Sequence, residues 1–321
     1  MRKILRKLVA LAAVAGALLC LPAAASAARS EEPIIEIKTN AYVSLGESNS
    51  FTILLGGIKE GDCGSGKVEY ELLPADYDSS TGSWSGTSIT CNVTKEGVVK
   101  IYGDAKNIDL MNASGCYISN IDCSGLTNLV ILDLSHNELQ LLDLTAYNKL
   151  QALYLNDNPF DVKPLLVGGN KPNLMILDLG QISHLDQSFN LSDYPELATF
   201  DAWSNKDLNK LDPTGCPNLQ KISIDSTPVK SLDVTKNPKL IILNISDTGI
   251  SSIDLSNNPL LRELYCVHMS GTVNTGVKIP VLDVTKNPAL VYLFASGNDI
   301  KKIDLSNNVE LQDLYLTSNK L

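Results

Sequence analysis

A leucine pattern that recurs about every 21 residues constrains this chain more than any other feature. The pattern L-x-x-L-x-L-x-x-N-x-L begins at Leu129, and the equivalent of this first leucine returns at intervals of 21 to 24 residues, with one interval of 29, as far as Leu311. A unit this short cannot bury its leucines alone, whereas stacked units share one continuous core. The period therefore predicts a solenoid.

Alternation within each unit predicts short strands, because Leu-x-Leu aims two side chains inward and one outward. A second such element follows in each unit, as at Leu142 and Leu144. We therefore expect a mainly β fold with a short strand on both sides of every coil and about 4.8 Å between coils. Asn-Pro pairs at 237–238, 258–259 and 287–288 predict stiff turns at one corner. At the opposite corner, a column of side chains should turn inward and bond the backbone; it consists of Asn137, Asn158, Asn205, Asn298 and Asn319, with Thr227 and Thr248 as substitutes.

Three segments, LDLSHNEL (132–139), SLDVTKNPKL (231–240) and SIDLSNNPLL (252–261), resemble leucine-rich repeats. With its near-duplicated half-repeat and its export signal, the chain resembles exported leucine-rich repeat proteins of Bacteroidetes-type bacteria over roughly residues 105–321. The resemblance implies partner binding at a surface, often recognition of a host protein or glycoprotein, without chemistry. The chain departs from the common horseshoe form of that family because it lacks a helical half-repeat, so strong curvature is not expected.

The sequence divides into three segments. Residues 1–27 contain a basic front, an apolar run and Ala25-Ser26-Ala27, which predicts a signal peptide and a secreted, cell-surface or periplasmic protein without membrane insertion. Residues 28–103 lack the period and alternate instead, which predicts a small antiparallel, β-sandwich-like cap domain. Residues 104–321 form the solenoid of about nine coils, whose incomplete last coil favours a truncated product over an open end.

Composition and motifs exclude several functions. With 26 basic and 36 acidic residues the formal net charge is -10, which disfavours nucleic acid and anionic membranes as partners. The segment Gly61–Lys67 imitates a phosphate-binding loop, but Val68 replaces the required hydroxyl and a strand follows, so we expect a hairpin. His136, His184 and His268 share no neighbouring Ser or Cys nucleophile. We therefore expect neither an enzyme nor a bound cofactor or metal.

Two residue classes leave alternatives open. Asp-x-Ser/Thr elements stack on successive coils, and such a column could bind calcium, although bonds from each Asp to the nearby hydroxyl and backbone N–H are the favoured interpretation. In an oxidising compartment we predict a disulfide between Cys63 and Cys91, because Cys91 shares the inward face of its strand and Cys63 lies in a neighbouring loop. Cys123 and Cys266 replace core leucines and should remain buried thiols.

The candidate binding site lies where aromatic residues occupy the outward positions of consecutive coils. We expect Tyr265, Phe294 and Tyr315 to form one contiguous patch, beside an eight-residue insertion within Val267–Lys278. The predicted function is recognition of another protein through the variable strand face; the alternative is glycan binding, with the same rings as stacking platforms. The residues expected to carry most of the binding energy are Tyr265, His268, Tyr292, Phe294 and Tyr315. The oligomeric state is not specified by the sequence.

Overall fold

The computed structural model describes residues 108–160, 171–182, 185, 189–269 and 277–321, together with the strands between residues 35 and 102. The chain forms two compact units, Met1–Leu153 with Leu165–Gly168 and Tyr154–Pro164 with Gly169–Leu321. The predicted signal peptide, Cys63 and the predicted boundary between residues 103 and 104 lie outside the described residues.

The first unit contains two sheets and a separate hairpin. One sheet has the strand order β10-β1-β8-β3-β4, and the strands β11, β9, β2 and β7 follow one another in the second. The described strand pairs of this unit are antiparallel except β9 with β11, where the parallel coil register begins. The strand bounds are β1 Ile35–Thr39, β2 Ser50–Leu55, β3 Glu60–Asp62, β4 Lys67–Glu69, β5 Asp76–Asp78, β6 Ser83–Ser85, β7 Thr87–Asn92, β8 Val98–Tyr102, β9 Leu110–Asn112, β10 Ile118–Asp122 and β11 Ile131–Asp133.

The antiparallel sheet expected near the N-terminus is therefore present. The segment that imitates a phosphate-binding loop runs from β3 into β4, which pair as a hairpin with Asp62 opposite Lys67. A strand, rather than the helix that a phosphate-binding loop requires, follows that segment, as expected.

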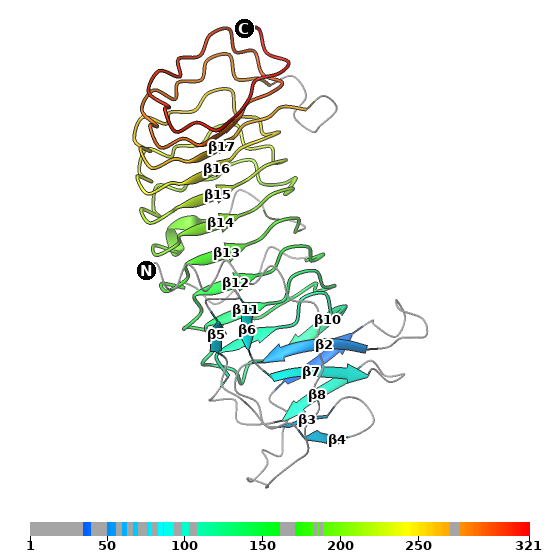
Figure 1. The fold of residues 1–321 in the computed structure, drawn as a ribbon. Coiled ribbons are helices and arrows are strands. Elements are labelled where there is room, and N and C mark those ends of the chain that lie inside the picture. Colours follow the sequence, from blue (N-terminus) through cyan, green and yellow to red (C-terminus); the bar gives the residue numbers. More distant parts are fainter. Residues whose placement is uncertain are drawn as a thin grey trace. The chain divides into compact units, whose positions relative to one another are not determined.

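The second unit is a parallel solenoid, with one three-residue strand in each coil as far as the structure describes it (Figure 1). Strand β12, Ala152–Tyr154, contains the residues at which the two units divide. A single turn of 3₁₀ helix, Leu191–Asp193, interrupts the described coils. The later strands are β13 Ile176–Asp178, β14 Thr199–Asp201, β15 Lys221–Ser223, β16 Ile242–Asn244, β17 Glu263–Tyr265, β18 Tyr292–Phe294 and β19 Asp313–Tyr315.

The repeating leucines form the core, as predicted. In β16 to β18 the middle residues, Leu243, Leu264 and Leu293, are completely buried and stack in register. The inward Asn column also behaves as predicted. Asn298 donates from Nδ2 to the carbonyl of Cys266 in the preceding coil (2.7 Å) and accepts from the backbone N–H of Ile279 through Oδ1 (2.9 Å).

The Asn-Pro corner forms the expected turns and also contains side-chain bonds that were not expected. Asn258 is completely buried, and its Nδ2 donates to the carbonyls of Val234 (3.0 Å) and Asn237 (2.9 Å) in the preceding coil. Asn237, Asn287 and Asn308 make equivalent bonds. This corner is therefore a second ladder of amides, which hydrophobic spacing did not reveal.

The expectation of a strand on both sides of each coil is wrong for the described coils of the second unit. Leu232 and Val234 are buried as the second Leu-x-Leu element requires, but they belong to no strand. The chain turns immediately after them, with the N–H of Asn237 bonded to the carbonyl of Val234 (3.0 Å). Side-chain amides and tight turns replace the backbone ladder on this side.

Candidate functional site

The three predicted aromatic residues form a stacked ladder on the outward side of β17 to β19. The ring centroids of Tyr265 and Phe294 lie 5.0 Å apart with an interplanar angle of 17°, and those of Phe294 and Tyr315 lie 4.7 Å apart at 11°. Parallel pairing places the three residues directly beside one another. Phe294 therefore has a ring against each of its faces, and the ladder presents mainly ring edges and the two tyrosine hydroxyl groups.

A second outward column runs beside this ladder. It consists of Glu263, Tyr292 and Asp313, which pair in register as the first residues of their strands. The Tyr265 hydroxyl donates to Oε2 of Glu263 (3.0 Å). Burial, and then this bond to a carboxylate, raises the pKa of Tyr265 to about 12, so its hydroxyl stays protonated at neutral pH.

His268 is half-buried and lies three residues after Tyr265, where the insertion begins. Burial lowers the pKa of its imidazole, against the opposing effect of Asp247, and thus favours the neutral ring. Asp247 accepts from the backbone N–H of Met269 through Oδ1 (2.8 Å). Residues 270–276 of the predicted insertion lie outside the described residues.

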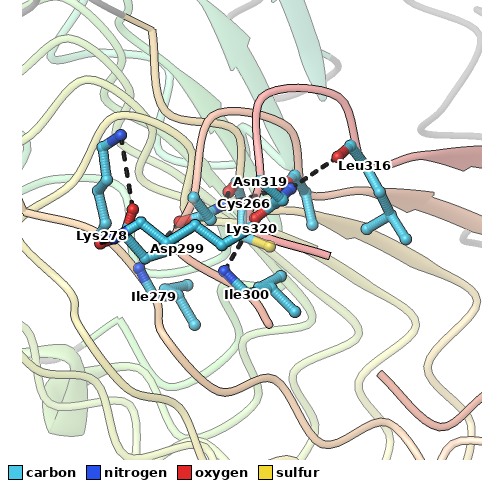
Figure 2. A network of polar contacts seen from close by, with 10 residues as sticks. Cys266, Lys278, Ile279, Asp299, Ile300, Leu316, Asn319 and Lys320 are labelled. Atoms are coloured by element: carbon cyan, nitrogen blue, oxygen red, sulfur yellow. Dashed lines mark hydrogen bonds and ion pairs between the residues drawn. The ribbon is translucent and has the colours of Figure 1, made fainter. Parts of the chain in front are cut away.

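Polar contacts join the coils that follow the insertion in the sequence (Figure 2). Asp299 pairs with Lys320 (2.7 Å) and lies 3.8 Å from Lys278. Asn319 accepts from the N–H of Ile300 (3.1 Å) and donates to the carbonyl of Leu316 (2.9 Å). The coil that carries Tyr315 is thus tied to its neighbour at two places.

In β13 to β16, polar residues occupy the strand position that the aromatic ladder occupies in β17 to β19. Asp201 is buried and pairs with Lys221 at 2.7 Å. Burial raises the pKa of Asp201 despite the opposing effect of Lys221. The partner of Asp201 lies 20 residues later in the chain, a contact that only the coil register creates.

Comparison with solved structures finds several that match part of this chain. A leucine-rich repeat protein of Leptospira interrogans matches with 21% identity and a TM-score of 0.53, over 61% of this chain and 51% of that one. The fold is a leucine-rich repeat solenoid. An internalin (inlF) of Listeria monocytogenes matches with 19% identity and a TM-score of 0.41, over 65% of this chain and 73% of that one. YopM of Yersinia enterocolitica matches with 25% identity and a TM-score of 0.43, over 60% and 43%.

The Leptospira likeness establishes the fold alone, and this chain spans about half of that structure's length. A scan of protein-family models and a search of curated proteins found no match. Within the described residues, no helix is long and apolar enough to cross a membrane.

The Asp-x-Ser/Thr column of the leucine-rich repeats makes the local bonds that we expected. Asp233 accepts from the N–H (2.9 Å) and the hydroxyl (2.7 Å) of Thr235, and Asp283 does the same with Thr285. These bonds lower the pKa of both carboxyl groups. In the part of the chain that the structure describes, no three His, Cys, Asp or Glu side chains are grouped as metal ligands.

Cys123 and Cys266, which replace core leucines, are buried free thiols, as predicted. Burial raises the pKa of Cys123 and of Cys266 to about 12, so neither is a thiolate at neutral pH. Cys123 lies 2.9 Å from the hydroxyl of the buried Tyr147. Cys116 and Cys216 are also buried thiols. The Cys63–Cys91 disulfide remains a prediction.

Proposed function

We propose that this chain is a non-enzymatic recognition module that binds another protein through the outward strand face of its leucine-rich repeats. The observation that carries the proposal is the ladder of Tyr265, Phe294 and Tyr315 on consecutive strands. Rigid, pre-stacked aromatic side chains lose little conformational entropy on binding and are typical interface anchors. His268 and Tyr292 flank the ladder and complete the proposed site.

Stacking within the ladder favours a protein partner over a glycan. A sugar ring packs on the face of an aromatic ring, but both faces of Phe294 are covered by its neighbours. Ring edges and hydroxyl groups can instead contact the apolar and polar groups of a protein surface. Glycan binding remains the second candidate because Tyr315 is 50% exposed and has Phe294 against only one face among the described rings.

We further propose that the protein acts outside the cytoplasm, exported by the signal peptide predicted in residues 1–27. A basic front, an apolar run and a small-residue cleavage site support this location. N-terminal sequencing of the exported protein should begin at Ala28. A mature protein that retains its first 27 residues would contradict the proposal.

Affinity capture followed by alanine substitution tests the proposed site. The chain is immobilised, partners are captured from the surrounding medium or from host extract, and the affinity of each purified partner is measured for the wild type and for single alanine variants of the five site residues. At least one variant should weaken binding by about 30-fold, which corresponds to ~2 kcal/mol. Val281→Ala is the matched control, because it truncates an apolar side chain that is 72% exposed and lies outside the strand face.

Two outcomes would contradict the proposal. Unchanged affinity in all five variants, with unfolding midpoints close to the wild type, would move the site elsewhere, most simply to the N-terminal sheets. Loss of binding when the partner is enzymatically deglycosylated, with its fold intact, would favour the glycan alternative.

A further inference from the structure

The face that carries the aromatic ladder has an excess of negative charge. The first and third residues of β16 to β19 point outward and comprise two carboxylates and no basic side chain. The carboxylates belong to Glu263 and Asp313, which lie on either side of Tyr292 in one column. Two coil steps of about 4.8 Å separate their backbones by roughly 10 Å.

These two carboxylates differ from others in the same unit that already have cationic partners. Asp201 pairs with Lys221, and Asp299 pairs with Lys320. Among the described residues, neither Glu263 nor Asp313 forms an ion pair, and Arg262, the nearest base along the chain to Glu263, is not bonded to it. Within the described part of the chain, Glu263 accepts a hydrogen bond from the Tyr265 hydroxyl alone, which orients its carboxylate beside the ladder.

The ladder supplies the complementary apolar surface for a cationic side chain. Lys and Arg place their aliphatic stems along apolar groups and keep their charged ends near carboxylates or water. The edges of Tyr265, Phe294 and Tyr315 offer such a surface next to the column of Glu263 and Asp313. The formal net charge of -10 for the whole chain would also attract a basic partner over a longer range.

We propose that the partner of this face is a basic protein segment, with Lys or Arg side chains that pair with Glu263 and Asp313 while their stems pack on the aromatic ladder. This inference rests on the proposed function, since it names the chemistry of the partner bound at the same face. A spacing of about 10 Å matches basic residues three positions apart in a polyproline II segment, where they lie on the same side, or seven apart in a helix.

A displayed library of random peptides of about 12 residues is a probe that requires no known partner. Each residue of an extended peptide adds about 3.3 Å, so such peptides are long enough to reach both carboxylates. Selection is carried out on the full immobilised chain, in parallel on the Phe294→Ala variant to identify peptides that depend on the ladder. We expect the ladder-dependent peptides to be enriched in Lys and Arg relative to the unselected library.

Charge-matched variants then test the two carboxylates directly. The double variant Glu263→Gln/Asp313→Asn should weaken a selected peptide by about tenfold or more and reduce the salt dependence of its binding between about 0.05 and 0.5 M NaCl. The control, Asp254→Asn/Asp304→Asn, removes the same charge from two exposed positions that are also two coils apart, in the Asp-x-Ser column. It should change the affinity less than twofold.

The outcomes separate the inference from the proposed function. Ladder-dependent peptides without enrichment in Lys or Arg would overturn the inference and leave protein recognition at this face intact. The same holds if both charge-matched pairs weaken binding equally, because the effect would then be a general one of net charge. If no selected peptide depends on Phe294, the proposed function of this face fails and the inference fails with it.

Discussion

The two amide ladders should differ in how much each contributes to stability, because their side chains satisfy different numbers of backbone groups. Replacing Asn258 by Leu removes two donated bonds, but both acceptors keep another partner: Val234 accepts from the N–H of Asn237, and Asn237 accepts from the N–H of Leu240. Oδ1 of Asn258 is buried without a donor, so its removal recovers part of the loss.

Replacing Asn298 by Leu should lower the free energy of unfolding more. It removes the bonds to the carbonyls of Cys266 and Ala295, and it also leaves the buried N–H of Ile279 without its acceptor. A net hydrogen bond contributes about 1 kcal/mol, and an unsatisfied buried group costs about 1–3 kcal/mol. The expected loss in free energy of unfolding is therefore about 1–2 kcal/mol for Asn258→Leu and about 3–5 kcal/mol for Asn298→Leu.

Urea unfolding followed by circular dichroism measures both losses. The midpoint should fall in the order stated, with the slope of the transition unchanged. Asn257→Ala is the matched control, because this exposed neighbour of Asn258 makes one long bond to Thr235 (3.3 Å), and we expect about 0.5 kcal/mol or less. Equal losses for the two leucine variants, or a loss for Asn257→Ala as large as that for Asn258→Leu, would refute this reasoning.

Three further predictions follow from single positions or columns. Gly297→Ala should destabilise the fold by at least ~1 kcal/mol, because Gly297 has a φ of +79° and its added Cβ would lie 1.8 Å from the His268 carbonyl oxygen; Ser318→Ala, at an equivalent turn with a φ of 58°, should be nearly neutral in thermal unfolding. Cys123 and Cys266 should react with a thiol reagent only after denaturation. Peptide mapping of the oxidised protein should show Cys63 linked to Cys91, and alkylation of Cys63 in the folded protein would contradict the predicted disulfide. Hydrogen bonds from Ser or Thr lower the carboxyl pKa values of the Asp-x-Ser/Thr column below 3.8, so the stabilisation from these bonds is present above pH ~4 and is lost as the pH falls through the lowered values. Carboxyl titration by NMR should show lowered pKa values for Asp212, Asp233, Asp254, Asp283 and Asp304, and unshifted values would contradict the bonds.

The period of the leucines determined the coil and its core. Inward residues must match from one coil to the next, so their spacing can be recognised in the sequence. Leu264 and Leu293 are buried and paired in register, as this spacing predicts. The inward Asn column could be predicted for the same reason. The outward positions of Tyr265, Phe294 and Tyr315 also followed from strand alternation.

Only the tertiary structure decided how aromatic and polar side chains meet across coils. The stacking that covers both faces of Phe294 depends on the register and rotamers of three separate strands. The burial of Asp201 requires Lys221, and the amide of Asn258 finds its acceptors in the preceding coil. Such contacts join residues about one coil apart without leaving a hydrophobic period, so a single sequence does not identify them. They nevertheless determine which ring surfaces and which carboxylates this face can offer to a partner.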